Sequence, residues 1–210
     1  MSRIVIFGAG GRAGRQAVAE ARRRGHEVTA VVRDPSRYGG LADGGVRIAA
    51  GDVTNAADVA TLSAGHHAGI NAAAVYGAGT DPGAFFTTAA HALVNGLRQA
   101  GVDRLIAVGL SVLLPGPDGT RQLDALPAEV QPFYLAHAAG LEVLRAEGGT
   151  LDWVYVSPAG DFDHEGERTG HYDVREHGDA GARISYADFA LALLDEAETP
   201  RHHHHHLAVS

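Results

Sequence analysis

The chain has 210 residues, of which 45% are hydrophobic and 20% charged, and this composition predicts a folded protein with one full hydrophobic core. Its formal net charge of −8 argues against non-specific binding to nucleic acid or to an anionic membrane. There is no cysteine, which excludes disulfides and thiolate chemistry, and no lysine, which excludes Schiff-base chemistry. No apolar run approaches the roughly 18 residues of a membrane span, and no signal peptide is recognisable. We therefore expect a cytoplasmic monomer or homodimer whose partner is a small-molecule substrate.

The first 60 residues have the pattern of a βαβ unit. Residues 3–7 form a continuous apolar run that predicts a buried strand, and residues 11–24 place apolar side chains at helical spacing. This helix ends in three arginines followed by a glycine, a composition that favours a helix C-terminus. A second strand is predicted at residues 27–32, and Asp34 opens a turn and a short helix.

Strands and helices continue to alternate along the rest of the chain. Further helices are expected at residues 55–62, 82–100, 128–147 and 186–198. Further strands are expected at residues 46–50, 68–75, 104–109, 151–156 and 207–209. Asn55 or Thr54 is a suitable N-cap for the first of these helices, and Asp81 and Gly101 bracket the second. The alternation predicts an α/β fold with a Rossmann-like, doubly wound, mostly parallel sheet in a single domain over residues 1–210.

Two long polar loops, at about residues 112–127 and 157–183, follow the fifth and sixth predicted strands. Both lie at the carboxyl edge of the sheet, where such folds bind ligands, so we expect them to enclose the substrate. The second loop gathers several polar side chains: Asp161, Asp163, His164, Glu165 and His171. Their spacing matches no metal-ligand pattern, which favours a solvated lid over a metal site.

Five consecutive histidines at residues 202–206 precede the last predicted strand. They are either a native linker into that strand or an engineered tag. Such a tract binds nickel or zinc adventitiously, and we predict no functional metal site there.

The phosphate-binding element is expected at the glycine-rich turn of residues 8–14, which joins the first strand to the first helix. Gly8 allows the tight turn, Gly10 and Gly11 let a pyrophosphate approach the backbone, and Gly14 lets the helix pack on the strand. The helix N-terminus then attracts the anion. The predicted phosphate-binding residues are Gly8, Gly10, Gly11, Arg12, Ala13 and Gly14.

The end of the second strand selects between the two nicotinamide dinucleotides. NAD sites usually place an acidic residue there for the ribose 2′-hydroxyl, whereas this strand is followed by Arg33. Arg33, with help from Arg37, would instead pair with a 2′-phosphate, which favours NADP(H) over NAD(H). Asp34 could still reach a ribose hydroxyl, and Arg33 could be an ordinary surface charge.

The ends of the third and fourth strands supply the remaining cofactor contacts. Asp52 and Val53 are expected beside the adenine ring, although Asp52 could equally be a turn or capping residue. Ala72, Ala73 and Ala74 are small enough for the nicotinamide ribose to lie against the backbone.

These segments resemble the atypical short-chain dehydrogenase/reductases, in the NAD(P)H-binding group that includes NmrA-like proteins and biliverdin reductase B. The resemblance runs along the whole chain. It is carried by residues 6–14, 25–35, 51–53, 101–106, 151–158, 166–170 and 200–209. The last of these segments favours the histidine tract being native.

The resemblance also implies candidate catalytic residues. The better-known members of the superfamily use a Tyr-x-x-x-Lys pair, but Ala138 stands where the lysine would follow Tyr134. Without lysine, a tyrosine with a pKa of about 10 is a poor general base. Ser111 and His137 stand at positions where the family has a serine and a histidine near the nicotinamide.

Structural roles remain open for each of these side chains. His137 could exchange a proton at neutral pH, or be a core histidine. Ser111 could satisfy a strand-end carbonyl, and Tyr134 could be a packing aromatic. Pro158 resembles the proline that packs by the nicotinamide, but could only stiffen its loop.

The sequence thus predicts an NADPH-dependent oxidoreductase that reduces a flavin, a quinone or a carbonyl-type small molecule. Because flavin and quinone reduction need little acid catalysis, the missing lysine favours these acceptors. The alternatives are a non-catalytic NADP(H) sensor or regulator, and a redox-neutral isomerase, epimerase or cyclase.

Overall fold

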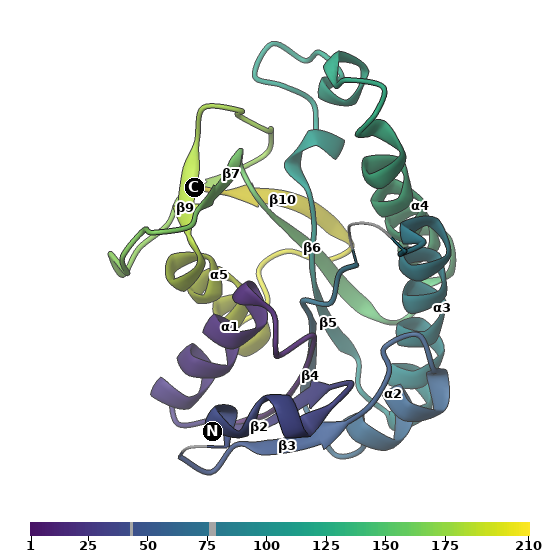
Figure 1. Cartoon of the computed structure of the whole chain (residues 1–210), viewed down its shortest axis with the longest axis vertical. Helices are drawn as coiled ribbons and strands as arrows, with labels where there is room; N and C mark the ends of the chain where they lie inside the picture. Colours follow the sequence, from purple (N-terminus) through teal and green to yellow (C-terminus); the bar gives the residue numbers. More distant parts are fainter. Residues whose placement is uncertain (43, 76–78) are drawn as a thin grey trace.

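A computed structural model describes residues 1–42, 44–75 and 79–210, and its centre is an eight-stranded sheet (Figure 1). The strand order is β3-β2-β1-β4-β5-β6-β10-β8, and only the short edge strand β8 runs antiparallel to its neighbour. The strands are β1 (Arg3–Phe7), β2 (Glu27–Val32), β3 (Arg47–Ala50), β4 (Ala68–Asn71), β5 (Arg104–Val108), β6 (Asp152–Pro158), β8 (Val174–Arg175) and β10 (His205–Val209). The predicted Rossmann-like, mostly parallel α/β fold is confirmed.

Among the described residues, five α-helices cover the two faces of this sheet (Figure 1). They are α1 (Arg12–Arg23), α2 (Ala56–Ser63), α3 (Pro82–Ala100), α4 (Gln131–Glu147) and α5 (Tyr186–Glu198). Helices α1 and α5 share one buried apolar cluster with the sheet, and α2, α3 and α4 share the other. Within the described ranges, no helix combines the length and the apolar character needed to cross a membrane.

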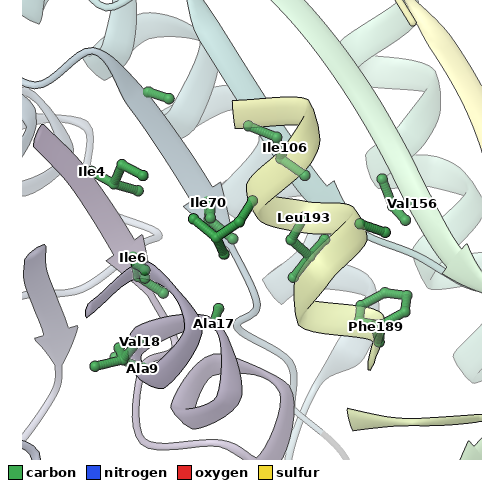
Figure 2. Close-up of a cluster of buried hydrophobic side chains, with 14 of the residues drawn as sticks. Ile4, Ile6, Ala9, Ala17, Val18, Ile70, Ile106, Val156, Phe189 and Leu193 are labelled. Atoms are coloured by element: carbon green, nitrogen blue, oxygen red, sulfur yellow. The ribbon is translucent and has the colours of Figure 1, made fainter. Parts of the chain in front are cut away.

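The face under α1 and α5 explains why the strands are continuous apolar runs. Ile6, Ile70 and Ile106 from three neighbouring strands are fully buried, and Leu193 and Phe189 of α5 pack over them (Figure 2). Since the opposite face is covered as well, every central strand is buried on both sides.

Local capping fixes the helix ends that the sequence predicts. The Asn55 side chain accepts hydrogen bonds from the first backbone N–H groups of α2, so Asn55 rather than Thr54 is its N-cap. Asp81 caps α3 in the same way, and Gly101 ends it with a left-handed φ of 70°. Glycine is favoured there because it has no Cβ to strain that conformation.

Several predicted boundaries are wrong. The strand expected at 68–75 ends at Asn71, because the Asn71 side chain accepts a hydrogen bond from the Ala73 N–H and turns the chain; residues 76–78 lie outside the described residues. The helix expected at 128–147 begins at Gln131, after a backbone turn that starts at Pro127. The sixth strand extends to Pro158, and the last one begins at His205.

The segment 157–183 is not only a loop. It contains β7 (Asp161–Asp163), which pairs in parallel with β9 (Arg183–Ser185), and also β8. Strands of two or three residues are too short to show alternation in a polar, glycine-rich sequence. The buried carboxylate of Asp188 fastens this segment to α5, accepting hydrogen bonds from Thr169, Gly170 and Ser185.

The histidine tract is an integral part of the fold, and each of its imidazoles has its own partner. These pairs are His202 with Glu196, His203 with Asp152, His204 with the Leu151 carbonyl, His205 with Glu176 and His206 with Ser157. The last two histidines belong to β10, and the His206 side chain is buried.

We predict that His206 makes the fold sensitive to acid. Burial lowers the pKa of His206 to about 3, whereas a histidine in an unfolded chain has a pKa of about 6.5. Between these values the unfolded chain binds the extra proton, so stability falls as the pH falls, by about 1 kcal/mol per pH unit for such a histidine. In urea unfolding between pH 4 and 7, His206→Gln should show a shallower fall than the native chain. The control His171→Gln, at an exposed position, should keep the native slope; an unchanged slope in His206→Gln would contradict the prediction.

Candidate functional site

A cleft of about 700 Å³ lies at the carboxyl edge of the parallel strands. Residues that follow β1, β2 and β3 line one end, and residues that follow β4 and β5 line its middle. The first turns of α3 and α4 line the other end with Phe85 and Phe133. Phe162 of β7 and Tyr186 of α5 also line the cleft, and they lie near Arg12, because His164 is within hydrogen-bond distance of both Arg12 and Tyr186. One end of the cleft therefore carries the glycine turn and its arginines, and the other carries phenylalanine rings.

The glycine turn is shaped by backbone contacts that no side chain could share. Gly8 has a φ of 73°, and a Cβ there would overlap the backbone of Ala73 at the end of β4. A Cβ on Gly14 would overlap the carbonyl of Gly8. A Cβ on Gly11, in contrast, would make only an ordinary contact, 3.4 Å from the carbonyl oxygen of Gly8. Gly8 and Gly14 thus hold strand and helix together, and Gly11 leaves the approach to the helix N-terminus free.

The geometry of this turn is suited to the phosphates of a dinucleotide. Gly11 is the N-cap of α1 and offers no side chain to the first N–H groups of the helix. Those groups, with Arg12 and Ala13, border the cleft. An uncapped helix N-terminus with an arginine beside it is suited to bind a pyrophosphate.

The arginines expected near the cofactor have different surroundings. Arg33 is exposed at the cleft and has no hydrogen-bond or ion-pair partner among the described residues. Arg37 lies outside the cleft lining. Asp34, which could have contacted a ribose, accepts hydrogen bonds from the N–H and hydroxyl of Ser36, and these lower the pKa of its carboxyl. Arg33, and not Asp34, is one of the residues that line the cleft.

Asp52, Val53 and Ala72–Ala74 all line the cleft, as expected for cofactor contacts. Asp52 is also a turn residue, because its carboxylate accepts hydrogen bonds from the N–H and hydroxyl of Thr54 at 2.9 and 2.7 Å. The turn role of Asp52 is confirmed and is compatible with an adenine contact, and cofactor binding by these residues stays a prediction.

The sequence analysis missed Tyr38, which lies against the glycine turn. A Cβ on Gly10 would overlap the Tyr38 ring, and the Arg15 guanidinium lies 5.5 Å from the centre of that ring. Tyr38 lines the cleft between Gly10 and Arg33. Its only signal in the sequence is a single aromatic residue in the loop after the second strand.

His137 is the one candidate catalytic residue that lines the cleft. Its Nδ1 lies 2.9 Å from the hydroxyl of Tyr155, and its ring lies 3.7 Å from that of Phe86 and 5.0 Å from that of Phe133, between ring centres. Burial lowers the pKa of His137 to about 3. Of the two roles open for His137, this burial favours a neutral imidazole over a group that exchanges protons at neutral pH, and a catalytic role for it stays a prediction.

The other candidates lie outside the cleft lining. Ser111 is buried at the start of a 3-10 turn after β5. Tyr134 is half-buried and packs its ring edge-on against Phe133, with the centres 5.6 Å apart. Pro158 is buried at the end of β6, where it pairs with Val209. Only His137 of this group contacts the space that a ligand would fill.

The segment after β6 contributes residues that the sequence had assigned to a solvated lid. Asp161, Phe162 and His164 line the cleft, together with Tyr186 at the start of α5. Phe162 and Tyr186 stack with centres 4.0 Å apart, and His164 Nδ1 lies 2.8 Å from Arg12 Nη1. The Arg12–His164 bond joins this segment to the glycine turn.

Asp163 and His171 of that segment line a second, more open hollow of about 800 Å³. Within residues 1–42, 44–75 and 79–210, no three His, Asp or Glu side chains gather as metal ligands.

Comparison with known proteins agrees with this geometry. The sequence model of an NAD(P)H-binding family matches residues 8–200. The chain belongs to this NAD(P)H-binding family. The resemblance to the atypical short-chain dehydrogenase/reductases is thereby confirmed, and the family indicates a nicotinamide cofactor without distinguishing NADP from NAD.

Individual relatives cover nearly the whole chain. The uncharacterized protein YwnB of Bacillus subtilis is 35% identical over 95% of this chain and 94% of its own. A solved structure from Streptococcus pneumoniae, provisionally described as an NADH-flavin reductase, is 31% identical, covers 100% of this chain and 99% of its own, and has a TM-score of 0.82. One from Bacteroides thetaiotaomicron, provisionally described as an epimerase, is 28% identical, covers 100% and 96%, and has a TM-score of 0.84.

We predict that Gly14 and Gly11 respond differently to alanine. Gly14→Ala forces a Cβ into the Gly8 carbonyl and should lower the free energy of unfolding by about 1–3 kcal/mol, as overpacking does. Gly11→Ala meets no such overlap and should cost less than about 1 kcal/mol, the range of a helix N-cap change. Urea unfolding of the two variants checks the difference, and equal losses would contradict the assignment of Gly14 to strand–helix packing.

Proposed function

We propose that the protein is an NADPH-dependent oxidoreductase that reduces a flavin, a quinone or a carbonyl-type small molecule. One observation carries the proposal: a single cleft joins the glycine turn and Arg33 at one end to an aromatic chamber at the other. The aromatic chamber is formed by Phe85 and Phe133, which line the cleft beside His137. A dinucleotide extended from the turn brings its nicotinamide toward these rings, because the chamber lies beyond β4 and β5 along the sheet edge.

The preference for NADPH rests on the free guanidinium of Arg33. It is exposed at the cleft, at the end of β2 where the adenosine ribose is held in this fold. A guanidinium forms strong, charge-assisted hydrogen bonds with a phosphate. The nearby carboxylate of Asp34 is engaged by Ser36 and gives no support to an NAD-type ribose contact.

The nicotinamide supplies a hydride when bound, and the protein positions it and excludes water. Ala72, Ala73 and Ala74 offer a surface of small side chains on which the nicotinamide ribose can lie. Val108, Gly109 and Leu110 border the same part of the cleft and complete its apolar wall.

The acceptor end suits a flat, aromatic acceptor. Phe85 and Phe133 line this end, and aromatic faces stack on further planar rings. Phe162 and Tyr186, which stack nearer Arg12 with 14° between their planes, offer a second aromatic face in the same cleft. There is no lysine, and burial lowers the pKa of His137 to about 3, so neither residue type supplies an acidic proton at neutral pH. Flavins and quinones need the least help of that kind. The provisional description of the S. pneumoniae relative as an NADH-flavin reductase supports this class.

The proposal is tested by stopped-flow oxidation of bound NADPH with a panel of flavins, quinones and ketones. We expect turnover with a flavin or quinone and slower turnover with ketones. Tight NADPH binding without oxidation by any acceptor would overturn the proposal and leave the sensor or the redox-neutral enzyme. Because the B. thetaiotaomicron relative is provisionally described as an epimerase, an isomerisation assay is the test of the redox-neutral alternative.

We predict that Arg33→Ala weakens NADPH binding by at least about tenfold, because one charge-assisted hydrogen bond contributes about 1.5–3 kcal/mol. NADH, which has no 2′-phosphate, should bind the variant and the native chain within about twofold. Fluorescence titration with each dinucleotide measures both effects. Arg37→Ala should cause a smaller loss, because Arg37 lies outside the cleft lining. Equal losses for NADPH and NADH in Arg33→Ala would overturn the cofactor assignment.

A further inference from the structure

We infer that the buried hydroxyl of Tyr155 fixes His137 in its Nε2–H tautomer, so that the imidazole presents a hydrogen-bond donor to an oxygen atom of the ligand in the cleft. His137 is then the residue that contacts the ligand, and Tyr155 is a positioning residue behind it. The use of this donor in reduction rests on the proposed function, whereas the tautomer itself does not.

The two side chains form a closed pair behind the cleft wall. Tyr155 lies in the middle of β6, is 5% exposed, and places its hydroxyl 2.9 Å from His137 Nδ1. The chain makes room for this ring at Gly109, where a Cβ would overlap it. The Tyr155 ring also meets the buried ring of His206 edge-on, with the centres 5.1 Å apart.

The hydrogen-bond donors of His137 and Tyr155 determine which ring nitrogen of His137 carries the proton. The hydroxyl of Tyr155 has His137 as its only hydrogen-bond partner among the described residues. If Nδ1 carried the proton, it would donate to the tyrosine oxygen, and the hydroxyl hydrogen would be buried without an acceptor. If Nε2 carries it, the hydroxyl donates to Nδ1 and no buried donor is left unpaired. A buried unpaired donor is costly, so the second arrangement is favoured.

The surroundings hold both groups in the protonation states that this arrangement needs. Burial raises the pKa of the Tyr155 hydroxyl, which therefore keeps its hydrogen at neutral pH. Burial also keeps the imidazole of His137 uncharged, as described above. The rings of Phe86 and Phe133 pack on the imidazole and restrict its rotation.

The opposite nitrogen, Nε2, is the atom available to a ligand. It has no partner among the described residues, it is not one of the buried polar atoms without a partner, and His137 borders the cleft. A neutral N–H donor stabilises negative charge that develops on an acceptor oxygen without giving up its proton. The proton that completes the reduction of the acceptor comes from water in this scheme.

The tautomer is measured directly by long-range ¹H–¹⁵N NMR of the histidine rings in the ligand-free protein, with His137→Gln used to assign the signals. We expect a protonated Nε2 and an unprotonated Nδ1 in the native chain. In Tyr155→Phe, which keeps the ring and removes the hydroxyl, the preference for Nε2–H should be lost. The control Tyr172→Phe also removes a tyrosine hydroxyl, one that donates to Asp195 at 2.8 Å, and should leave the His137 signals unchanged.

The role of the donor is measured by steady-state kinetics of the same variants. Tyr155→Phe should lower kcat about tenfold, the effect of one misplaced hydrogen bond, with little change in the KM for NADPH. Tyr172→Phe should keep the native kcat. A native kcat in Tyr155→Phe would overturn the positioning role.

The two measurements separate the inference from the proposed function. A protonated Nδ1 in the native chain overturns the inferred Nε2–H tautomer whatever the kinetics show. This NMR measurement is made on the native chain, so it does not depend on the folding of a variant. If the native chain has the Nε2–H tautomer but none of the tested acceptors oxidises its bound NADPH, the proposed function is overturned and the tautomer is still supported.

Discussion

The site depends on the absence of a side chain at Gly8 and Gly14. Gly8 lies against the backbone of Ala73, and Gly14 lies against the carbonyl of Gly8, so β1, α1 and β4 meet through backbone atoms alone. This contact brings the N-terminus of α1 to the sheet edge and sets Ala72–Ala74 beside it. A single Cβ at either glycine would separate helix from sheet, and with it the glycine turn from the rest of the cleft.

The two ends of the cleft differ in whether a charged group is exposed to water there. At the phosphate end, Arg12 and Arg33 are exposed and stay in contact with water, which suits an anionic ligand. At the other end, aromatic rings enclose His137 and remove the water that would stabilise an imidazolium. In a reduced nicotinamide dinucleotide the phosphates carry the charge and the dihydronicotinamide ring at the reacting end is uncharged, and the cleft matches that division.

The sequence predicts what depends on neighbours along the chain. Apolar runs predict the buried strands, Asp81 and Gly101 predict the ends of α3, and the glycine spacing predicts the turn. Contacts between distant segments carry no such pattern. Tyr155 reads as one more apolar residue of a strand, and its hydrogen bond to His137 depends on how β6 and α4 pack. The low pKa of His137 follows from the same packing, so it could not be predicted from the residue type.

A second histidine of the cleft obeys the same counting of donors. His164 Nδ1 lies within hydrogen-bond distance of Arg12 Nη1 and of the Tyr186 hydroxyl, at 2.8 and 3.2 Å. A guanidinium can only donate, so Nδ1 must be the acceptor and any ring proton must lie on Nε2. A doubly protonated ring would turn a donor toward a cation and break the link between the glycine turn and the segment after β6. His137 and His164 thus each present Nδ1 as a hydrogen-bond acceptor, one to a buried tyrosine and the other to an arginine of the glycine turn.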